Sequence, residues 1–342
     1  MRSTCKSEKP SFPKISLIRT LILLTGFAML QYLSGCGTAN PPPPAPISGH
    51  DLQVFMASGR NPQIFGVRTF KTPFGIGAKN AGNIKGARTD ILEFKSSKKS
   101  PLPVIEVTTK GRNGRDMLID TSSRKSWVSF PVAKEYGMVP AGKQPASYTA
   151  RHVNGSKIAF LCIAPQIEFD KMTLTEGLFY ALADHESLWP VSRDYRHDDI
   201  EMVLGCGMLK AFAFARIDFK NRSIVLSASD KYPLPNDRIV ASAPIVWENG
   251  AVAIDCEIDG VEQTAYIDTG GAFQIARRNP ESASARTVKI KDLVFPTPSI
   301  SPAKDFLIDR REMPSLGAEL FQDYIITIDM VEQMIHFEHP PA

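Results

Sequence analysis

Cysteine, histidine and tryptophan are scarce in this chain of 342 residues, which contains five, six and three of them. The cysteines form no Cys-x-x-Cys pair, and the histidines are scattered, so the sequence offers no cluster with zinc-ligand spacing. Apart from the N-terminal segment discussed below, no long apolar run is present, and even that run is too short for a membrane-spanning helix. We therefore expect neither a metal ion nor another cofactor.

An excess of charge of one sign is also missing from most of the chain. The formal net charge is +4, but residues 1–35 carry five basic side chains and one acidic side chain, so residues 36–342 are neutral overall. A neutral protein lacks the positive field that attracts polyanions, and we expect no nucleic-acid partner. The composition, with 43% hydrophobic and 22% charged residues, excludes a collagen, a coiled coil or a largely disordered chain.

Residues 1–35 have the organisation of a bacterial signal peptide. Basic side chains precede an apolar stretch from Leu21 to about Leu33, a length typical of a secretory h-region. The stretch ends in Leu33-Ser34-Gly35-Cys36, which resembles a lipobox, the motif in which the cysteine is lipidated and becomes the mature N-terminus. The alternative is an ordinary signal peptide in which Cys36 is incidental.

Residues 36–48 follow this motif and include four consecutive prolines, which predict a stiff, extended tether. Together with the lipobox, the tether predicts a lipid-anchored protein of the bacterial cell envelope, with its globular part in the periplasm or exposed at the surface. Gly37 after the cysteine favours the outer membrane. The three remaining cysteines permit at most one disulfide in an oxidising compartment, and the sequence leaves open which of them pair: Cys162, Cys206 and Cys256.

Two segments of the chain repeat one pattern of strands and turns. The first, residues 104–121, consists of a β-type run, a turn at Asn113-Gly114 and a second run that ends in Asp-Thr. The second, residues 252–269, has the same order with its turn at Asp259-Gly260. Asn-Gly and Asp-Gly are strong signals for a two-residue hairpin, so each segment is read as strand, hairpin and strand.

The repeat continues with Leu204-Gly205 and Leu316-Gly317, each of which precedes two further β-type runs. Both copies are therefore mainly β, and their tandem order predicts two similar lobes. The expected divisions are an N-terminal extension of the first lobe, the first lobe, an inter-lobe linker and the second lobe, over residues 49–101, 102–230, 231–241 and 242–340.

Each copy carries Asp-Thr at the end of a strand. One such pair is typical of a turn or a helix N-cap, but two at the same place in a repeat indicate a function. Lobes related by a two-fold axis place equivalent loops face to face, so Asp120 and Asp268 are expected to meet. Two carboxylates in contact share one proton, which allows one to activate a water while the other protonates a carbonyl oxygen.

The first loop, Asp120 to Ser123 followed by Trp127-Val128, resembles the first catalytic loop of the pepsin-like and retropepsin-like aspartic proteases. Asp268 to Gly271 resembles the second. This resemblance covers residues 100–340 and implies an all-β, bilobal acid-protease-like fold. It implies catalytic Asp120 and Asp268, with a hydroxyl cross-link between the lobes from two threonines. The residues expected to support the loops are Thr121, Ser122, Ser123, Thr269, Gly270 and Gly271.

The resemblance also implies one flap hairpin, and the segment Ser147–Phe160 fits this place, with Asn154-Gly155 as its turn. Tyr148 and His152 are the other candidate flap residues. The alternative is a surface hairpin without a role, because nothing chemical marks its tip.

Two departures from the family pattern bear on activity. Ser122 stands where glycine is expected, and a side chain there is expected to crowd the facing loop and strain the backbone. Gly271 replaces the usual serine or threonine and removes a hydroxyl from Asp268. The leading expectation is a monomer that hydrolyses peptide bonds in a peptide or protein substrate. The alternative is an inactive lobe pair that binds a peptide or an envelope partner in the same cleft.

Overall fold

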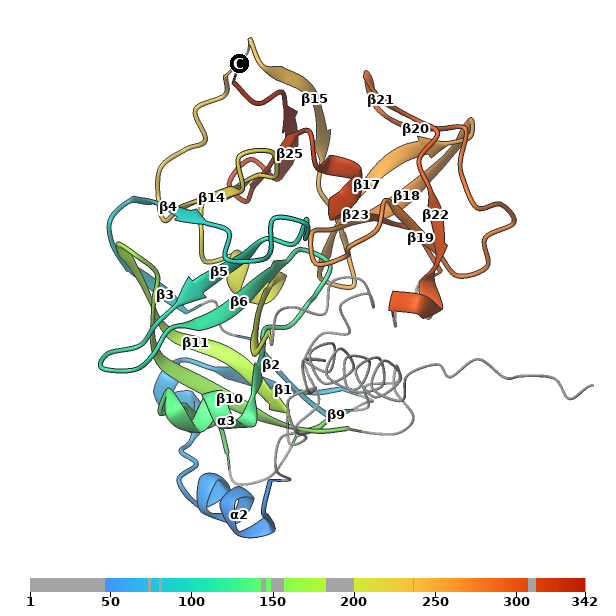
Figure 1. Cartoon of the computed structure of the whole chain (residues 1–342). Helices are drawn as coiled ribbons and strands as arrows, with labels where there is room; N and C mark the ends of the chain where they lie inside the picture. The colour runs from blue at the N-terminus through green and yellow to red at the C-terminus, as the bar shows by residue number, and fades with distance from the viewer. Residues whose placement is uncertain are drawn as a thin grey trace, which may run out of the picture. The chain divides into compact units, whose positions relative to one another are not determined.

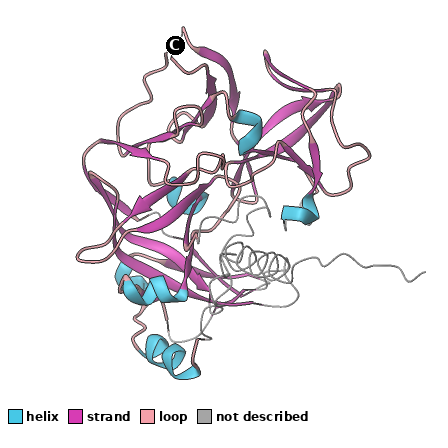
Figure 2. Cartoon of the chain, viewed as in Figure 1, coloured by secondary structure: helices cyan, strands magenta, loops and turns pink. Residues whose placement is uncertain are grey.

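The two-lobed β architecture predicted from the repeat is confirmed in the computed structural model (Figures 1 and 2). The structure describes residues 47–72, 75–79, 82–142, 146–148, 157–182, 200–235, 237–306 and 312–341. Cys36 and the signal and tether segments up to residue 46 lie outside these residues, and so do His152, Asn154 and Gly155. None of the helices in the described part is long and apolar enough to cross a membrane.

The sheet of the first lobe contains nine of the described strands, in the order β5-β6-β12-β7-β11-β10-β8, with β3 on β11 and β9 on β10. Its strands are β3 (Asn83–Gly86), β5 (Val104–Val107), β6 (Arg115–Asp120), β7 (Trp127–Ser129), β8 (Val139–Pro140), β9 (Ala146–Tyr148), β10 (Lys157–Glu168), β11 (Met172–Leu182) and β12 (Met202–Gly205). Two short helices flank it, α3 (Phe130–Glu135) and α4 (Cys206–Leu209). Before this sheet come α2 (Gly49–Ala57), η1 (Pro62–Phe65) and the hairpin of β1 (Arg68–Thr72) and β2 (Gly75–Lys79).

The sheet of the second lobe contains eight described strands, in the order β21-β20-β17-β18-β23-β19-β22, with β16 on β17. Its elements are β16 (Val246–Glu248), β17 (Ala251–Ile258), β18 (Val261–Asp268), β19 (Ile275–Arg277), β20 (Thr287–Ile290), β21 (Leu293–Pro296), β22 (Ile300–Pro302), η3 (Ala303–Phe306), β23 (Ser315–Gly317) and η4 (Ala318–Phe321).

A third sheet of six described strands draws on both halves of the chain, in the order β15-β25-β24-β13-β14-β4. The strands are β4 (Thr89–Glu93), β13 (Phe214–Asp218), β14 (Ser223–Ser227), β15 (Ile239–Pro244), β24 (Ile325–Asp329) and β25 (Met334–Glu338). The order is symmetric about the β13–β24 pair, so each half contributes three strands. β4, which lies in the range expected to extend the first lobe, and β15 occupy equivalent edges.

The side chains of this six-stranded sheet alternate between two faces, as a period of two requires. One face is apolar and fully buried, with Ile217, Ile326 and Phe337 in one row across the strands. The other face carries polar residues, among them Arg216 and Thr327. The apolar face belongs to the hydrophobic core that also includes the inner residues of both lobes.

The two predicted hairpin turns have different outcomes. Asp259 and Gly260 have φ values of 55° and 82°, as a two-residue type I′ turn requires, so this turn is confirmed. The turn predicted at Asn113-Gly114 is wrong. Thr108 leaves the β5–β6 ladder to pair with Glu168, which lengthens the connection, and the left-handed residue in it is Gly111, with φ 74°.

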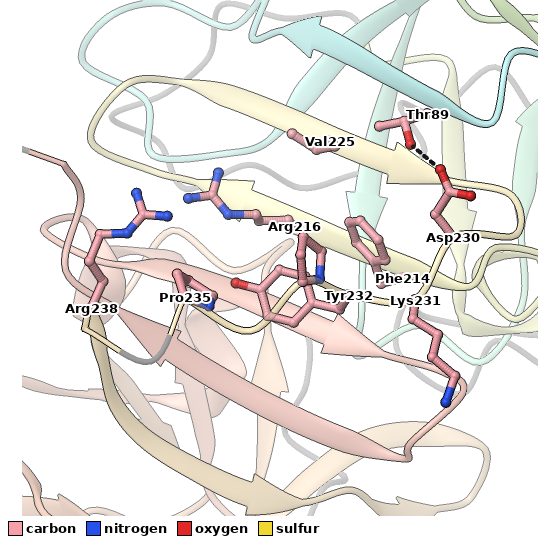
Figure 3. Close-up of a pocket in the computed structure, with 10 residues that line it drawn as sticks. Thr89, Phe214, Arg216, Val225, Asp230, Lys231, Tyr232, Pro235 and Arg238 are labelled. Carbon is pink, nitrogen blue, oxygen red and sulfur yellow. Dashed lines mark hydrogen bonds between the residues drawn. The ribbon is translucent and has the colours of Figure 1, made fainter.

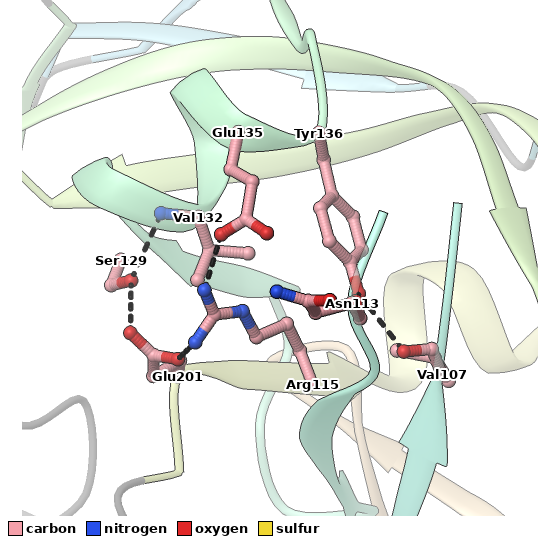
Figure 4. A network of polar contacts seen from close by, with 8 residues as sticks. All are labelled: Val107, Asn113, Arg115, Ser129, Val132, Glu135, Tyr136 and Glu201. Atoms are coloured by element: carbon pink, nitrogen blue, oxygen red, sulfur yellow. Dashed lines mark hydrogen bonds and ion pairs between the residues drawn. The ribbon is translucent and has the colours of Figure 1, made fainter. Parts of the chain in front are cut away.

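A polar network anchors the strand that leads to Asp120 (Figure 4). Arg115, at the start of β6, donates to Glu201 at 2.9 Å and also bonds to Glu135 at the end of α3. The Ser129 hydroxyl accepts a hydrogen bond from the backbone N–H of Val132, in the first turn of α3, and donates one to Glu201. This network fixes β6, α3 and the residue just before β12 relative to one another.

Candidate active site

The two Asp-Thr loops begin at equivalent strand ends. In the first lobe β12 runs parallel to β6 and places Gly205 opposite Asp120, while it runs antiparallel to β7. In the second lobe β23 runs parallel to β18 and places Gly317 opposite Asp268, while it runs antiparallel to β19. The structure therefore confirms that the two copies share one strand pairing around the aspartates.

Gly205 and Gly317 are required at these crossings because the loops lie directly on them. A Cβ on Gly205 would lie 2.2 Å from the carbonyl oxygen of Lys125, and one on Gly317 would lie 2.2 Å from that of Phe273. Their backbone angles are nearly the same, φ −91° and ψ 174° against φ −92° and ψ 173°, so the need is for space and not for a left-handed conformation.

Thr121 and Thr269 link the two loops by reciprocal hydrogen bonds. The backbone N–H of Thr121 donates to Thr269 Oγ1 at 3.1 Å, and that of Thr269 donates to Thr121 Oγ1 at 3.2 Å. Each hydroxyl in turn donates to a carbonyl of the opposite strand, Thr121 to Ile267 at 2.5 Å and Thr269 to Ile119 at 2.8 Å. The cross-link expected from the resemblance is present.

Asp120 is fully buried, and one of its carboxylate oxygens accepts several hydrogen bonds from the loop that follows it. Oδ1 accepts the backbone N–H groups of Ser122 at 2.8 Å and Ser123 at 3.1 Å, and the Ser122 hydroxyl at 2.8 Å. Three donors on one oxygen stabilise an ionised carboxylate. The expected backbone strain at Ser122 is wrong, because Ser122 is not among the described residues with positive φ, and its side chain hydrogen-bonds Asp120.

The second loop packs directly against the first carboxylate. A Cβ on Gly270 would lie 2.8 Å from Asp120 Cγ, so glycine is needed at this position for the close approach. Asp268 itself is 1% exposed. The contact brings the loop that carries Asp268 against the side chain of Asp120, as expected for two facing loops.

Gly271 has a different neighbour. A Cβ there would lie 2.4 Å from Cε1 of Phe273 and 3.2 Å from Asp268 Cγ. The buried ring of Phe273 therefore fills the space that a serine or threonine side chain would need, and the ring also lies 2.6 Å from where a Cβ of Gly317 would stand. The missing hydroxyl beside Asp268 is thus coupled to an aromatic residue two positions later.

Ser123 and Trp127 form the outer side of the first loop. The Ser123 hydroxyl donates to the carbonyl of Lys125 at 2.8 Å and accepts from Trp127 Nε1 at 3.2 Å. Lys125 Nζ lies 4.2 Å from the ring centroid of Tyr180 on β11, a cation–π distance. Burial, together with the charge of Arg124, lowers the pKa of Lys125 to about 8.

A thiol supports the first loop from below. Cys206 Sγ donates to the carbonyl of Thr121 at 2.9 Å. Burial, followed by the negative charge of Asp120, raises the pKa of this thiol to about 12, so it is a neutral donor. The described cysteines form no disulfide, since all three are free and buried: Cys162, Cys206 and Cys256.

Of the other predicted residues, Tyr148 lies on β9, which pairs antiparallel with the start of β10. The two arms of the predicted flap hairpin are therefore present, while its tip is outside the described residues. Phe273 and Lys125 were not singled out from the sequence, and Cys206 was considered only as a possible disulfide partner. For Phe273, the available sequence signal was an aromatic residue two positions after Gly271. Within the described ranges, no three His, Cys, Asp or Glu side chains are grouped to hold a metal ion.

Comparisons with known proteins give no family assignment. No family model matches the chain, and no curated protein matches it. Among solved structures the chain is similar to one described as the crystal structure of basic 7S globulin from soybean. The identity is 10%, the TM-score is 0.45, and the match covers 75% of this chain and 94% of that chain.

Proposed function

We propose that this protein is an aspartic-type endopeptidase that uses Asp120 and Asp268 to activate a water. The observation that carries the proposal is the reciprocal Thr121–Thr269 linkage, which joins two buried Asp-Thr loops on equivalent strand ends. The packing of Gly270 on the carboxyl carbon of Asp120 supports the proposal, because it holds the second loop against the first aspartate.

In this proposal the two aspartates have different roles. Asp120 Oδ1 accepts three hydrogen bonds that favour the ionised form, which suits a general base toward the attacking water. Two carboxylates in one site share one proton, so the second member of the pair can serve as the acid. Asp268 is then the acid that protonates the carbonyl oxygen of the scissile bond.

The test is cleavage of an unfolded protein or a peptide library across pH 3 to 8, with mass-spectrometric readout. Asp120→Asn and Asp268→Asn should each reduce cleavage at least about 1,000-fold, because neither carboxylate works without the other. The matched control is Asp292→Asn, which changes an exposed aspartate on the β20–β21 turn and should leave cleavage unchanged. Statine-type inhibitors should block the activity. Cleavage that survives either substitution in the loops refutes the dyad.

The second candidate function is binding of an extended peptide without cleavage, and Phe273 favours it. Its ring occupies the side-chain space beside Asp268, which leaves that carboxyl without the hydroxyl of the family pattern. If the wild-type protein cleaves nothing at any pH, peptide binding measured by library pull-down with the purified protein decides for this candidate. A bound peptide should then be displaced by a statine-type inhibitor.

We further propose that Cys36 is lipidated and anchors the protein in the cell envelope, which is supported by the sequence Leu33-Ser34-Gly35-Cys36 after a short apolar run. Mass spectrometry of the membrane fraction should find a diacylglyceryl group on an N-terminal Cys36. Cys36→Ser should leave the signal peptide uncleaved or release the protein from membranes. An unmodified N-terminus at another residue contradicts the proposal.

A further inference from the structure

A cavity of about 270 Å³ lies on the polar face of the six-stranded sheet (Figure 3). Its floor comes from β13 and β14, through Phe214, Arg216 and Val225. Its other wall is the segment after β14, which contributes Tyr232 and Arg238 among others. None of these residues belongs to the Asp-Thr loops, so this cavity is separate from the candidate active site.

Beneath the cavity, a polar network pairs one of the lining cations, Arg216, with a buried carboxylate. Arg216 donates through Nε and Nη2 to the two oxygens of Glu338, at 3.4 Å and 3.3 Å, and Glu338 is fully buried. Tyr232 and Thr327 also donate hydroxyl hydrogen bonds to Glu338. The Nη1 group of Arg216 takes no part in these bonds. Four hydrogen-bond donors therefore surround Glu338, while within the described part of the chain the Nη1 edge of the Arg216 guanidinium forms no hydrogen bond and can bond a ligand.

Of the other charged residues that line the cavity, Lys231 and Asp230 have ion-pair partners in the described structure, whereas Arg238 has none. Lys231 pairs with Glu332 at 3.3 Å, and Asp230 pairs with Arg88 at 3.8 Å. Within the described part of the chain, no acidic side chain pairs with Arg238. In the view of Figure 3, the guanidinium groups of Arg216 and Arg238 reach the same end of the cavity. Two guanidiniums, of which only Arg216 pairs with a carboxylate among the described residues, attract a second anion.

Apart from Thr89, whose hydroxyl donates to Asp230, the rest of the cavity wall is largely apolar. The rings of Phe214 and Tyr232 are buried and meet edge to face, with centroids 5.2 Å apart and an interplanar angle of 64°. Pro233 and Pro235 add apolar surface that cannot donate a backbone hydrogen bond. The volume lies just below the range of about 300–1,000 Å³ that is usual for small-molecule sites, so the ligand must be small.

We propose that this cavity binds a small organic oxyanion, whose carboxylate or phosphate lies between Arg216 and Arg238 and whose apolar part packs on Phe214 and Tyr232. A guanidinium binds either kind of anion through paired hydrogen bonds. The aromatic wall distinguishes an organic anion from an inorganic one. This site does not depend on the proposed peptidase activity.

The test is isothermal titration calorimetry of the full chain with four probes: benzoate, phenyl phosphate, inorganic phosphate and benzamidine. Benzamidine has nearly the shape of benzoate with the opposite charge, and it should not bind. Benzoate or phenyl phosphate should bind saturably with one site per chain, and at least about tenfold more tightly than inorganic phosphate. The stronger of the two identifies the anionic group. Failure of both to bind at millimolar concentration overturns the proposal, and so does equally tight binding of inorganic phosphate.

Variants locate the site. Arg238→Gln should weaken binding of the preferred probe at least about tenfold without a change in thermal stability, since this side chain forms no ion pair in the described structure. The matched control is Lys231→Gln, a cation on the rim that is already paired, and its effect should stay within about twofold. Equal losses in the two variants indicate unspecific charge attraction and overturn the proposal. Asp268→Asn should leave probe binding unchanged, whereas weaker binding in that variant moves the anion to the aspartate loops and overturns this assignment.

Discussion

Thr121 and Thr269 each donate a backbone N–H to the hydroxyl oxygen of the other, at 3.1 Å and 3.2 Å, across 148 positions of the chain. Both residues are fully buried. Because each hydroxyl is at once the acceptor for one loop and the donor to the opposite strand, neither loop has its hydrogen bonds completed without the other. The two aspartates are therefore positioned by one shared unit rather than by two independent lobes.

Removal of one hydroxyl from this unit should destabilise the whole protein. Thr269→Val keeps the shape but leaves the Thr121 N–H buried without its acceptor, and we expect a loss of about 1–3 kcal/mol in the free energy of unfolding. Thr269→Ser keeps the hydroxyl and should restore most of it. In urea unfolding, the double variant with Thr121→Val should lose less than the sum of the single losses. Additive losses contradict a shared unit.

The glycines behind the loops should tolerate no side chain. Gly317→Ala places a Cβ 2.2 Å from one carbonyl oxygen and 2.8 Å from another, both on the backbone of the second loop. We expect a loss of about 3 kcal/mol or more, or failure to fold, and the same for Gly205→Ala. The control is Gly49→Ala in α2, where no atom lies within 4 Å of the new Cβ. That variant should be unchanged or slightly more stable in thermal unfolding.

The repeat and its Asp-Thr loops could be predicted because short, local patterns carry them. A strand that ends in Asp-Thr, a Leu-Gly pair downstream and an Asp-Gly turn are each visible in a few residues. The turn at Asn113-Gly114 could not be predicted correctly, because Thr108 is drawn into a pairing with Glu168, sixty positions away. Distant pairing of this kind overrides a local turn signal.

In the second loop, the sequence predicted the loss of a hydroxyl but not the side chain that takes its place. Gly271 reads as a lost hydroxyl in the sequence, whereas the structure shows the ring of Phe273 in that space. The role of β4 was also hidden, because residues 49–101 carry no repeat signal that pairs them with β14 in the six-stranded sheet. Arg238 likewise could not be predicted as a binding residue, because only the fold brings it to the same cavity as Arg216.

Stability should fall in mild acid because of His336. This residue is 5% exposed, and its Nδ1 lies 2.8 Å from Ser242 Oγ. Burial lowers its pKa from the ordinary value of 6.5, although Asp329 and Glu338 act in the opposite direction. The unfolded chain then takes up a proton near pH 6.5 while the folded chain resists it. The contribution is fully present above this pH and is lost as pH falls toward the lower folded-state pKa.

Urea unfolding at pH 8, 7, 6 and 5.5 tests this sign. The wild type should lose stability between pH 7 and 5.5, and His336→Gln should show a smaller loss over the same interval. His339→Gln changes an exposed histidine that stacks on Tyr324, and it should keep the wild-type dependence. A wild type that is equally stable at pH 7 and 5.5 contradicts the assignment to His336.

Ser122 should tune the acidic limb of the proposed peptidase activity. Its hydroxyl donates to Asp120 Oδ1 at 2.8 Å, beside two backbone donors that any residue at positions 122 and 123 would retain. Ser122→Ala removes one hydrogen bond to the ionised carboxylate, so the acidic limb of kcat/KM should move to higher pH. Ser122→Gly should shift it the same way, and no gain from relieved strain is expected. Ser123→Ala is the matched control, because that hydroxyl bonds Lys125 and Trp127 instead, and its profile should keep the wild-type limb. An unmoved limb in Ser122→Ala, or an equal shift in both variants, means that the Ser122 hydroxyl does not set the protonation of Asp120.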